Sequence, residues 1–171
     1  KPRTKIIRML LEKGASVDVQ DSKGRSPLMR ACRGRNGSIL DLILERNPDL
    51  DSRDKQGKSA LMYSRYSPSF QRLLITRGAS VDFQDCRGRT RLMGCVEESD
   101  LATSELIIER SKDLNLQDET GMNALDYAFT EVLDRDRGGR DSIRRLLIEK
   151  GVKANVYHQV MDLSIRCPSS E

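Results

Sequence analysis

Apolar residues recur along the chain as short trios at a regular distance. Three positions after each trio stands Gly14, Asn47, Gly78, Ser111 or Gly151, where a helix commonly ends in a left-handed residue; Ser111 suits this least. Each trio is therefore predicted to lie near the end of a helix. The trios are Met9-Leu10-Leu11, Leu42-Ile43-Leu44, Leu73-Leu74-Ile75, Leu106-Ile107-Ile108 and Leu146-Leu147-Ile148.

A polar signal recurs in phase with the trios. It is an Asp followed three residues later by Gly, at Asp21/Gly24, Asp54/Gly57, Asp85/Gly88 and Asp118/Gly121. Two residues after each Gly stands a residue that caps helix N-termini well: Ser26, Ser59, Thr90 or Asn123. A Leu follows at a fixed place, and Pro27 occupies a first helical position, where its missing N–H costs nothing. Each unit is thus predicted to be a turn, a short helix, a loop, a longer helix and an extended hairpin arm.

The Asp-x-x-Gly signal returns after 33, 31 and 33 residues. A repeat of this length indicates stacked units, because one unit alone cannot bury its apolar trio. The motifs resemble the ankyrin repeat, whose elements appear here as Asp21 to Met29 (DSKGRSPLM), Leu74-Ile75 and Gly78 to Asp82 (GASVD). The resemblance covers roughly residues 3–157. It implies an all-α solenoid of stacked helix-turn-helix units with β-hairpin-like fingers.

The units differ in detail within one predicted domain, residues 1–171. They are a half repeat (3–20), a repeat (21–53), a short repeat (54–84), a repeat (85–117), a repeat with an inserted charged loop at 134–140 (118–157), and a capping segment or tail (158–171). The family's His after the Leu is replaced by Met29, Met62, Met93 and Asp126, so we expect the hydrogen bonds of that imidazole to be missing. The short repeat has Arg65 where the family prefers a small apolar residue, and we expect it to be the least regular.

The candidate chemistry argues against an enzyme and against a metal site. Cys32, Cys86, Cys95 and Cys167 show no C-x-x-C spacing, and His158 is the only histidine. Cys32 and Cys95 fall in apolar helix patterns, and Cys86 is expected to be an exposed thiol. The chain has no phosphate-binding loop motif, so neither a catalytic residue nor a cofactor is predicted. The cysteine usage favours an intracellular, cytoplasmic or nuclear protein.

Charge changes along the chain and suggests what a partner would be. Residues 1–60 carry 14 basic and 8 acidic residues, residues 61–117 carry 8 of each, and residues 118–171 carry 8 and 10. In the ankyrin family, partners bind on the concave side at the finger tips and the ends of the first helices. The matching residues are Lys23, Arg25, Arg33, Lys55, Lys58, Tyr66, Arg87, Arg89, Glu97, Glu98 and Met122, with Glu119, Thr120, Thr130 and Glu131 in the same places.

These residues predict a protein-interaction module for an acidic protein or peptide, with Tyr66 and Met122 as apolar anchors. Ordinary solvated fingers would explain the same charges, and nucleic-acid binding by the basic tips is the alternative function. The modest net charge of +4 and the 4% aromatic content count against nucleic acid. Neither membrane insertion nor a small-molecule substrate is predicted, and Cys86 beside Arg87 is a weaker candidate for a redox or dimerisation contact.

Overall fold

The computed structural model describes residues 2–130 and 137–155, and the regular elements there are helices. The predicted all-α fold class is confirmed. The only β-type pairing in this part of the chain is an isolated antiparallel bridge between Arg53 and Ser59. The helices are α1 (Pro2–Glu12), α2 (Pro27–Arg33), α3 (Gly37–Leu44), α4 (Ala60–Tyr63), α5 (Pro68–Thr76), α6 (Arg91–Glu97), α7 (Leu101–Arg110), α8 (Ala124–Phe129) and α9 (Arg137–Glu149).

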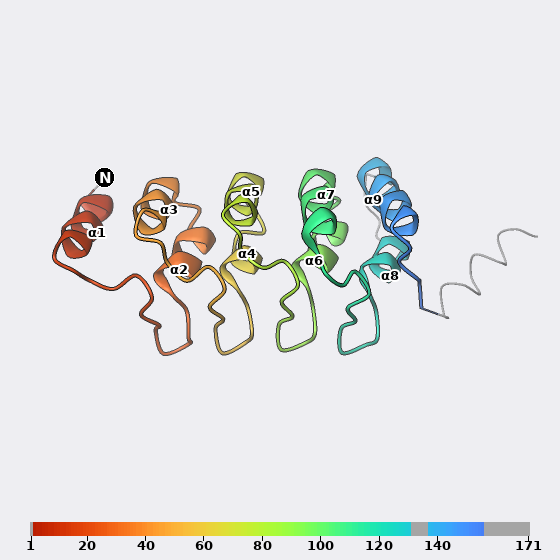
Figure 1. Ribbon diagram of the computed structural model, residues 1–171, viewed down its shortest axis with the longest axis horizontal. Helices are drawn as coiled ribbons and strands as arrows, with labels where there is room; N and C mark the ends of the chain where they lie inside the picture. Colours follow the sequence, from red (N-terminus) through yellow and green to blue (C-terminus); the bar gives the residue numbers. More distant parts are fainter. Residues whose placement is uncertain (1, 131–136, 156–171) are drawn as a thin grey trace, which may run out of the picture. The chain divides into compact units, whose positions relative to one another are not determined.

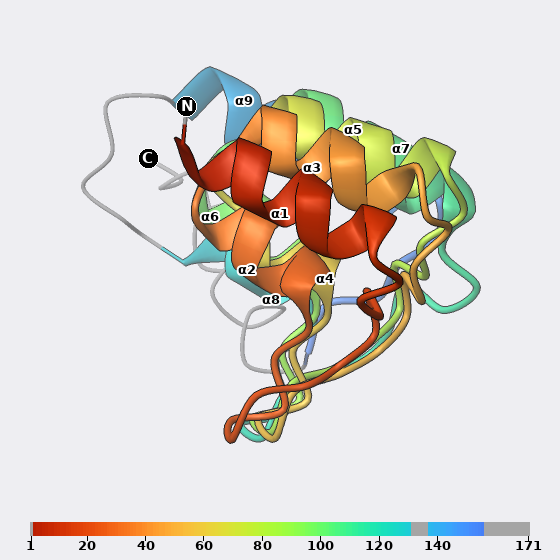
Figure 2. The ribbon, with the colours of Figure 1, turned by 90° about the vertical axis from the view of Figure 1, so that its left-hand side faces the viewer.

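The chain divides into two compact units, residues 1–86 (unit 1) and 87–171 (unit 2). In unit 1, the short first helices α2 and α4 pack side by side, and α2 also packs against α3. The second helices α1, α3 and α5 form a separate row, and the fingers extend from the side of α2 and α4 (Figures 1 and 2). In unit 2, α6 packs against α7 and α8, and α9 packs against α7 and α8.

Most residues of the apolar trios lie in the core of the two units, as their spacing predicts, but Met9, Leu10 and Ile148 are exposed. Leu42, Ile43 and Leu44 of α3 are all buried, and so are Ile107 and Ile108 of α7. Burying one such side chain stabilises the folded state by roughly 1.5–3 kcal/mol. The trios therefore supply much of the stability of a chain that has few aromatic residues.

The four predicted capping residues each precede a helix. The side chains of Ser26, Thr90 and Asn123 accept hydrogen bonds from backbone N–H groups of α2, α6 and α8. Ser59 takes the same position before α4, but its side chain makes no capping bond. The helix ends also follow the prediction at Gly14, Asn47, Gly78 and Gly151, which have positive φ, whereas the backbone of Ser111 is extended.

The fingers are tight hairpins built on the Asp-x-x-Gly motif. In the first finger (Asp21–Arg25), Gly24 N–H donates to Asp21 C=O at 2.8 Å and Asp21 N–H donates to Arg25 C=O at 3.1 Å. Gly24 has a φ of +77°, and a Cβ there would lie 2.9 Å from the backbone N of Lys55. Glycine is therefore required both by the turn and by the close approach of the second finger (Asp54–Lys58).

The structure corrects two expectations about the fourth repeat. The charged loop expected over 134–140 ends earlier, because Arg137–Arg140 form the first turn of α9 and Arg140 is buried. Asp126 takes over the role of the missing imidazole: its carboxylate accepts from Asn123 N–H at 2.9 Å and from Asn155 N–H at 2.7 Å. An acid can replace His here because both partners are backbone donors.

Three further expectations concern the short repeat, the methionines at the family's His position and the C-terminal segment. Helix α4 has four residues where α2 and α6 have seven, in the repeat that is shorter by sequence. Buried Met29 and Met93 occupy the family's His position in their helices. The expected capping segment at 158–171, which includes His158 and Cys167, lies outside the described residues, as does Glu131.

Candidate protein-binding face

The carboxylate of Asp21 is hydrogen-bonded within the first finger and to α2. Asp21 Oδ1 accepts from the backbone N–H groups of Lys23 and Arg25, and Oδ2 accepts from the Arg25 side chain at 2.8 Å. Arg30 of α2 donates to the same oxygen at 3.0 Å. These hydrogen bonds, those of Arg25 foremost, hold the pKa of Asp21 well below its usual range. Arg25, a predicted binding residue, is thus held in an ion pair, while Lys23 is exposed at the tip.

The second finger repeats this arrangement with a tyrosine. Asp54 Oδ1 accepts from the backbone N–H groups of Gln56 and Lys58, and Oδ2 accepts from the Tyr63 hydroxyl at 2.6 Å. Burial, followed by the hydrogen bond to Asp54, raises the pKa of Tyr63 to about 12; the charges of Arg25 and Arg33 act in the opposite direction. The positive charge of Arg33, at the end of α2, therefore acts on the hydroxyl of Tyr63 in α4 of the next repeat.

Four predicted cations of unit 1 lack a carboxylate partner in the part of the chain that the structure describes. Lys55 N–H donates to Lys23 C=O at 3.0 Å, so the two finger tips lie side by side and their lysines are neighbours. Lys23, Lys55 and Arg33 are exposed, and Lys58 is half-buried. Among the described residues, none of these four forms an ion pair. Their positive charge is consequently available to a partner.

Tyr66 lies in the loop that joins α4 to α5, in the same unit as these cations. Its side chain is 64% exposed, and the Arg65 guanidinium lies 4.6 Å from the centre of its ring. The sequence predicts Tyr66 at the end of the first helix of its repeat, whereas α4 ends at Tyr63 and Tyr66 follows three residues later.

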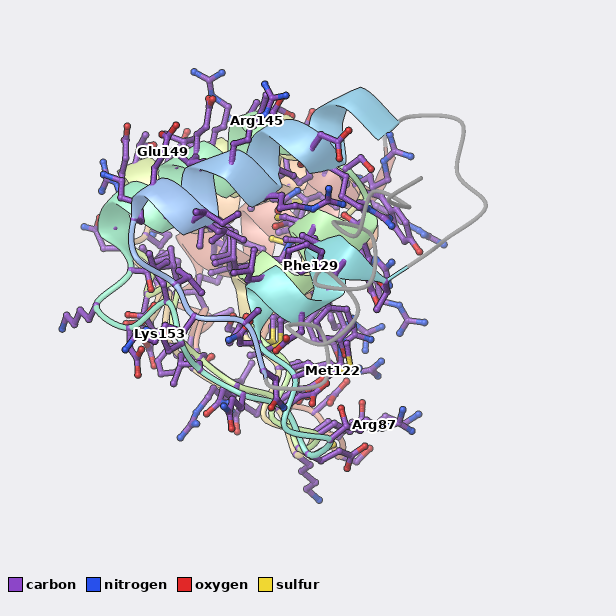
Figure 3. The ribbon with its side chains drawn as sticks, turned by 90° about the vertical axis from the view of Figure 1, so that its right-hand side faces the viewer. Arg87, Met122, Phe129, Arg145, Glu149 and Lys153 are labelled. Carbon is purple, nitrogen blue, oxygen red and sulfur yellow. The ribbon has the colours of Figure 1, made fainter. Side chains whose placement is uncertain are left out.

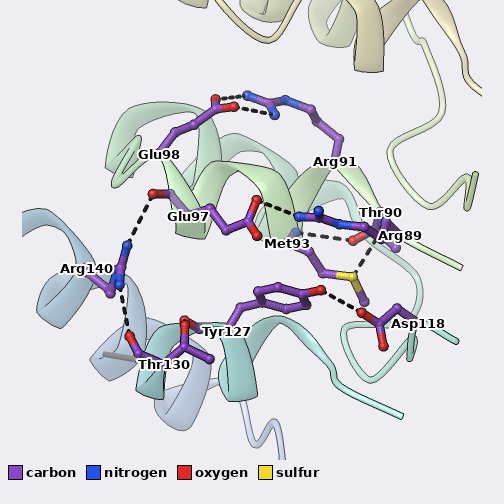
Figure 4. A network of polar contacts seen from close by, with 10 residues as sticks. All are labelled: Arg89, Thr90, Arg91, Met93, Glu97, Glu98, Asp118, Tyr127, Thr130 and Arg140. Atoms are coloured by element: carbon purple, nitrogen blue, oxygen red, sulfur yellow. Dashed lines mark hydrogen bonds and ion pairs between the residues drawn. The ribbon is translucent and has the colours of Figure 1, made fainter. Parts of the chain in front are cut away.

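The predicted cations of unit 2 are already paired with carboxylates. Arg89 Nη2 lies 2.5 Å from Glu97 Oε2, and buried Arg91 lies 2.6 Å from Glu98 Oε2 (Figure 4). Arg87 faces Glu119 more loosely, at 3.9 Å. The predicted binding residues Arg89, Glu97 and Glu98 therefore neutralise charge within the protein.

The fourth finger (Asp118–Met122) has the same internal bonding as the second. Asp118 Oδ2 accepts from the Tyr127 hydroxyl at 2.6 Å. Burial acts to raise the pKa of Asp118, but hydrogen bonds from Thr120, Tyr127 and Met122 lower it overall. Met122 is half-buried and, with Arg87, lies toward the finger end of the unit (Figure 3).

Comparison with known families agrees with this geometry. The family model described as ankyrin repeats (3 copies) matches residues 2–69. Residues 2–69 are ankyrin repeats. No curated protein gives a significant match to the chain. Ankyrin repeats are generally non-enzymatic protein–protein interaction modules, and the fingers and first helices described above are the parts of this fold that carry the predicted binding residues.

Sequence reasoning missed the hydrogen bonds that tie the second and fourth fingers to α4 and α8. The Asp-to-Tyr spacing of nine residues, at Asp54/Tyr63 and Asp118/Tyr127, is a signal that could have revealed them. It also missed Arg140, which is 7% exposed and donates to Thr130 C=O at 3.0 Å and to Glu97 C=O at 3.2 Å (Figure 4). No sequence pattern distinguishes Arg140 from the other charged residues of the insertion.

The thiols and acids of the described residues form no metal cluster. Cys32 and Cys95 are buried and Cys86 is exposed, as predicted. Burial raises the pKa of both Cys32 and Cys95 to about 12. Within residues 2–130 and 137–155, no group of three His, Cys, Asp or Glu side chains is arranged to hold a metal ion. In the same ranges, no helix is long and apolar enough to cross a membrane.

Proposed function

We propose that this chain is a protein-interaction module that binds an acidic protein or peptide segment on the face formed by its fingers and first helices. The observation that carries the proposal is a set of four cations in unit 1 that have no carboxylate partner within residues 2–130 and 137–155: Lys23, Arg33, Lys55 and Lys58. Asp21 is paired with Arg25 and Arg30, and Asp54 accepts hydrogen bonds from neutral groups of its own repeat, so among the described residues neither carboxylate forms an ion pair with these four cations.

The overall charge distribution supports the same partner. Residues 1–86 carry 17 Lys or Arg and 10 Asp or Glu, whereas residues 87–171 carry 13 and 16. An acidic partner would be attracted to the positive part, which increases the association rate at low salt. Exposed charges of this kind contribute more to association rate and specificity than to affinity, so salt should weaken binding measurably.

The proposal is tested with a fluorescein-labelled acidic peptide whose fluorescence anisotropy is followed as the protein is added. We expect saturable binding that weakens as salt increases. In the double variant K55E/K58E, binding should weaken about tenfold or more, because each reversal replaces attraction by repulsion. Absence of saturable binding, or equal binding by the double variant, would overturn the proposal.

A labelled DNA duplex, measured in the same way, tests the alternative function. Nucleic-acid binding requires many phosphate contacts, and its affinity falls steeply with salt. Tighter binding of the duplex than of the acidic peptide, with such a slope, would replace the present proposal by the nucleic-acid alternative. We expect the acidic peptide to bind more tightly, since the face offers few rings on which bases could stack.

A further inference from the structure

Unit 1 places basic and aromatic residues at equivalent positions of two neighbouring repeats. Arg33 and Tyr66 each lie twelve residues after the Asp of their finger, and α2 packs beside α4. Arg30 and Tyr63 are equivalent in the same way, nine residues after that Asp. The helix part of the face therefore has arginines on one repeat and tyrosines on the next, with lysines at both finger tips.

The loop that carries Tyr66 is held in a fixed conformation. The Ser64 hydroxyl donates to Leu61 C=O at 2.7 Å, and Ser67 N–H donates to Ser64 C=O at 2.8 Å. The side chain of Gln71, which is fully buried in α5, donates to the Arg65 C=O at 3.3 Å. The large side chain of Tyr66 is thus exposed on a backbone that is already ordered in the folded protein, so a partner would not have to order this loop on binding. An exposed ring on a fixed backbone is typical of an interface anchor.

From these observations we infer that unit 1 recognises an acidic segment in which an apolar side chain stands beside the carboxylates. The carboxylates pair with the cations of the finger tips and of α2, and the apolar side chain packs on the ring of Tyr66. This inference rests on the proposed function and adds two claims: the partner has an apolar residue, and unit 1 carries the recognition.

The second claim follows from the paired charges of unit 2. Arg87 occupies the same place on its finger as Lys23, two residues after the Asp. Glu119 faces Arg87, whereas Lys23 has no carboxylate partner among the described residues. Reversing the charge at these two positions is therefore a matched comparison between the units.

The experiment uses the full chain and two labelled peptides of Glu and Asp, one with a central Phe and one with a central Ala. Wild type should bind the Phe peptide about tenfold more tightly, the size expected for one buried aromatic contact. Y66A should bind both peptides alike, and Y66F should keep the preference because it keeps the ring. K23E should weaken both peptides severalfold, whereas R87E should change them less than about twofold.

The outcomes separate the inference from the proposed function. Equal binding of the two peptides by wild type, or an unchanged preference in Y66A, overturns the apolar anchor while acidic binding stands. An R87E effect as large as that of K23E overturns the assignment to unit 1. Failure of wild type to bind either peptide overturns the proposed function itself. The far-UV circular dichroism of each variant should match wild type, because Lys23, Tyr66 and Arg87 are exposed.

Discussion

Arg140 offers a sharp test of how unit 2 is held together. Its guanidinium donates to the C=O of Thr130, which follows α8, and to the C=O of Glu97, the last residue of α6. A cation at a helix C-terminus is also favoured by the helix dipole. Carbonyl groups at the end of a helix have no partner within that helix. By bonding two such groups, the buried side chain of Arg140 joins α9 to the ends of α6 and α8.

The cost of removing this side chain can be worked from its bonds. A hydrogen bond from a charged donor contributes roughly 1.5–3 kcal/mol, and an arginine side chain regains up to about 2 kcal/mol of conformational entropy when released. Two such bonds are worth about 3–6 kcal/mol, and subtracting about 2 kcal/mol for this entropy leaves an expected loss of about 1–4 kcal/mol in the free energy of unfolding for R140A. With a urea dependence of about 2 kcal/mol per molar, the unfolding midpoint should fall by about 0.5–2 M.

The assay is urea unfolding followed by far-UV circular dichroism, with R145A as the matched control. Arg145 lies on the same helix but is exposed and points outward (Figure 3). Its removal should change the free energy of unfolding by less than about 0.5 kcal/mol. Hydrogen exchange should quicken in R140A at the ends of α6 and α8. Equal stability of the two variants would refute the assignment of Arg140 as a joint between helices.

Two further predictions concern titration and thiol reactivity. Because the pKa of both Tyr63 and Tyr127 is raised to about 12, their contribution to stability is complete below pH 10 and is lost as the pH rises toward 12. Ultraviolet titration should show two late tyrosines, and Y63F should remove one; ionisation of both near pH 10 would contradict the buried contacts. Ellman's reagent should label Cys86 rapidly and reach Cys32 and Cys95 only on unfolding, since these two are buried with a pKa near 12. Rapid labelling of Cys32 in folded protein would argue against this packing.

Periodicity was sufficient to predict the repeats, because each trio, cap and turn is a local requirement of one unit. The burial of Leu42-Ile43-Leu44 and the turn at Gly24 follow directly from the pattern. The same periodicity predicts Tyr66 at the end of a first helix, whereas α4 ends at Tyr63 and Tyr66 lies in the loop that follows.

Pairing between side chains was not predictable in this way. Whether Arg89 is available to a partner depends on Glu97 lying opposite it, eight residues away. Lys23 has an equally basic sequence context, yet no carboxylate of the described residues faces it. Charge counting treats the two residues alike, so the difference between the units emerges only when the side chains are placed in three dimensions.

The main-chain bond between the first two finger tips has a consequence for how such a surface can change. Lys55 N–H and Lys23 C=O fix the spacing of the tips without any use of the lysine side chains. Substitutions at these positions can therefore alter which partner is preferred while leaving the scaffold intact. Selection, or an engineer, could retarget unit 1 by exchanging tip residues alone, at little cost in folding.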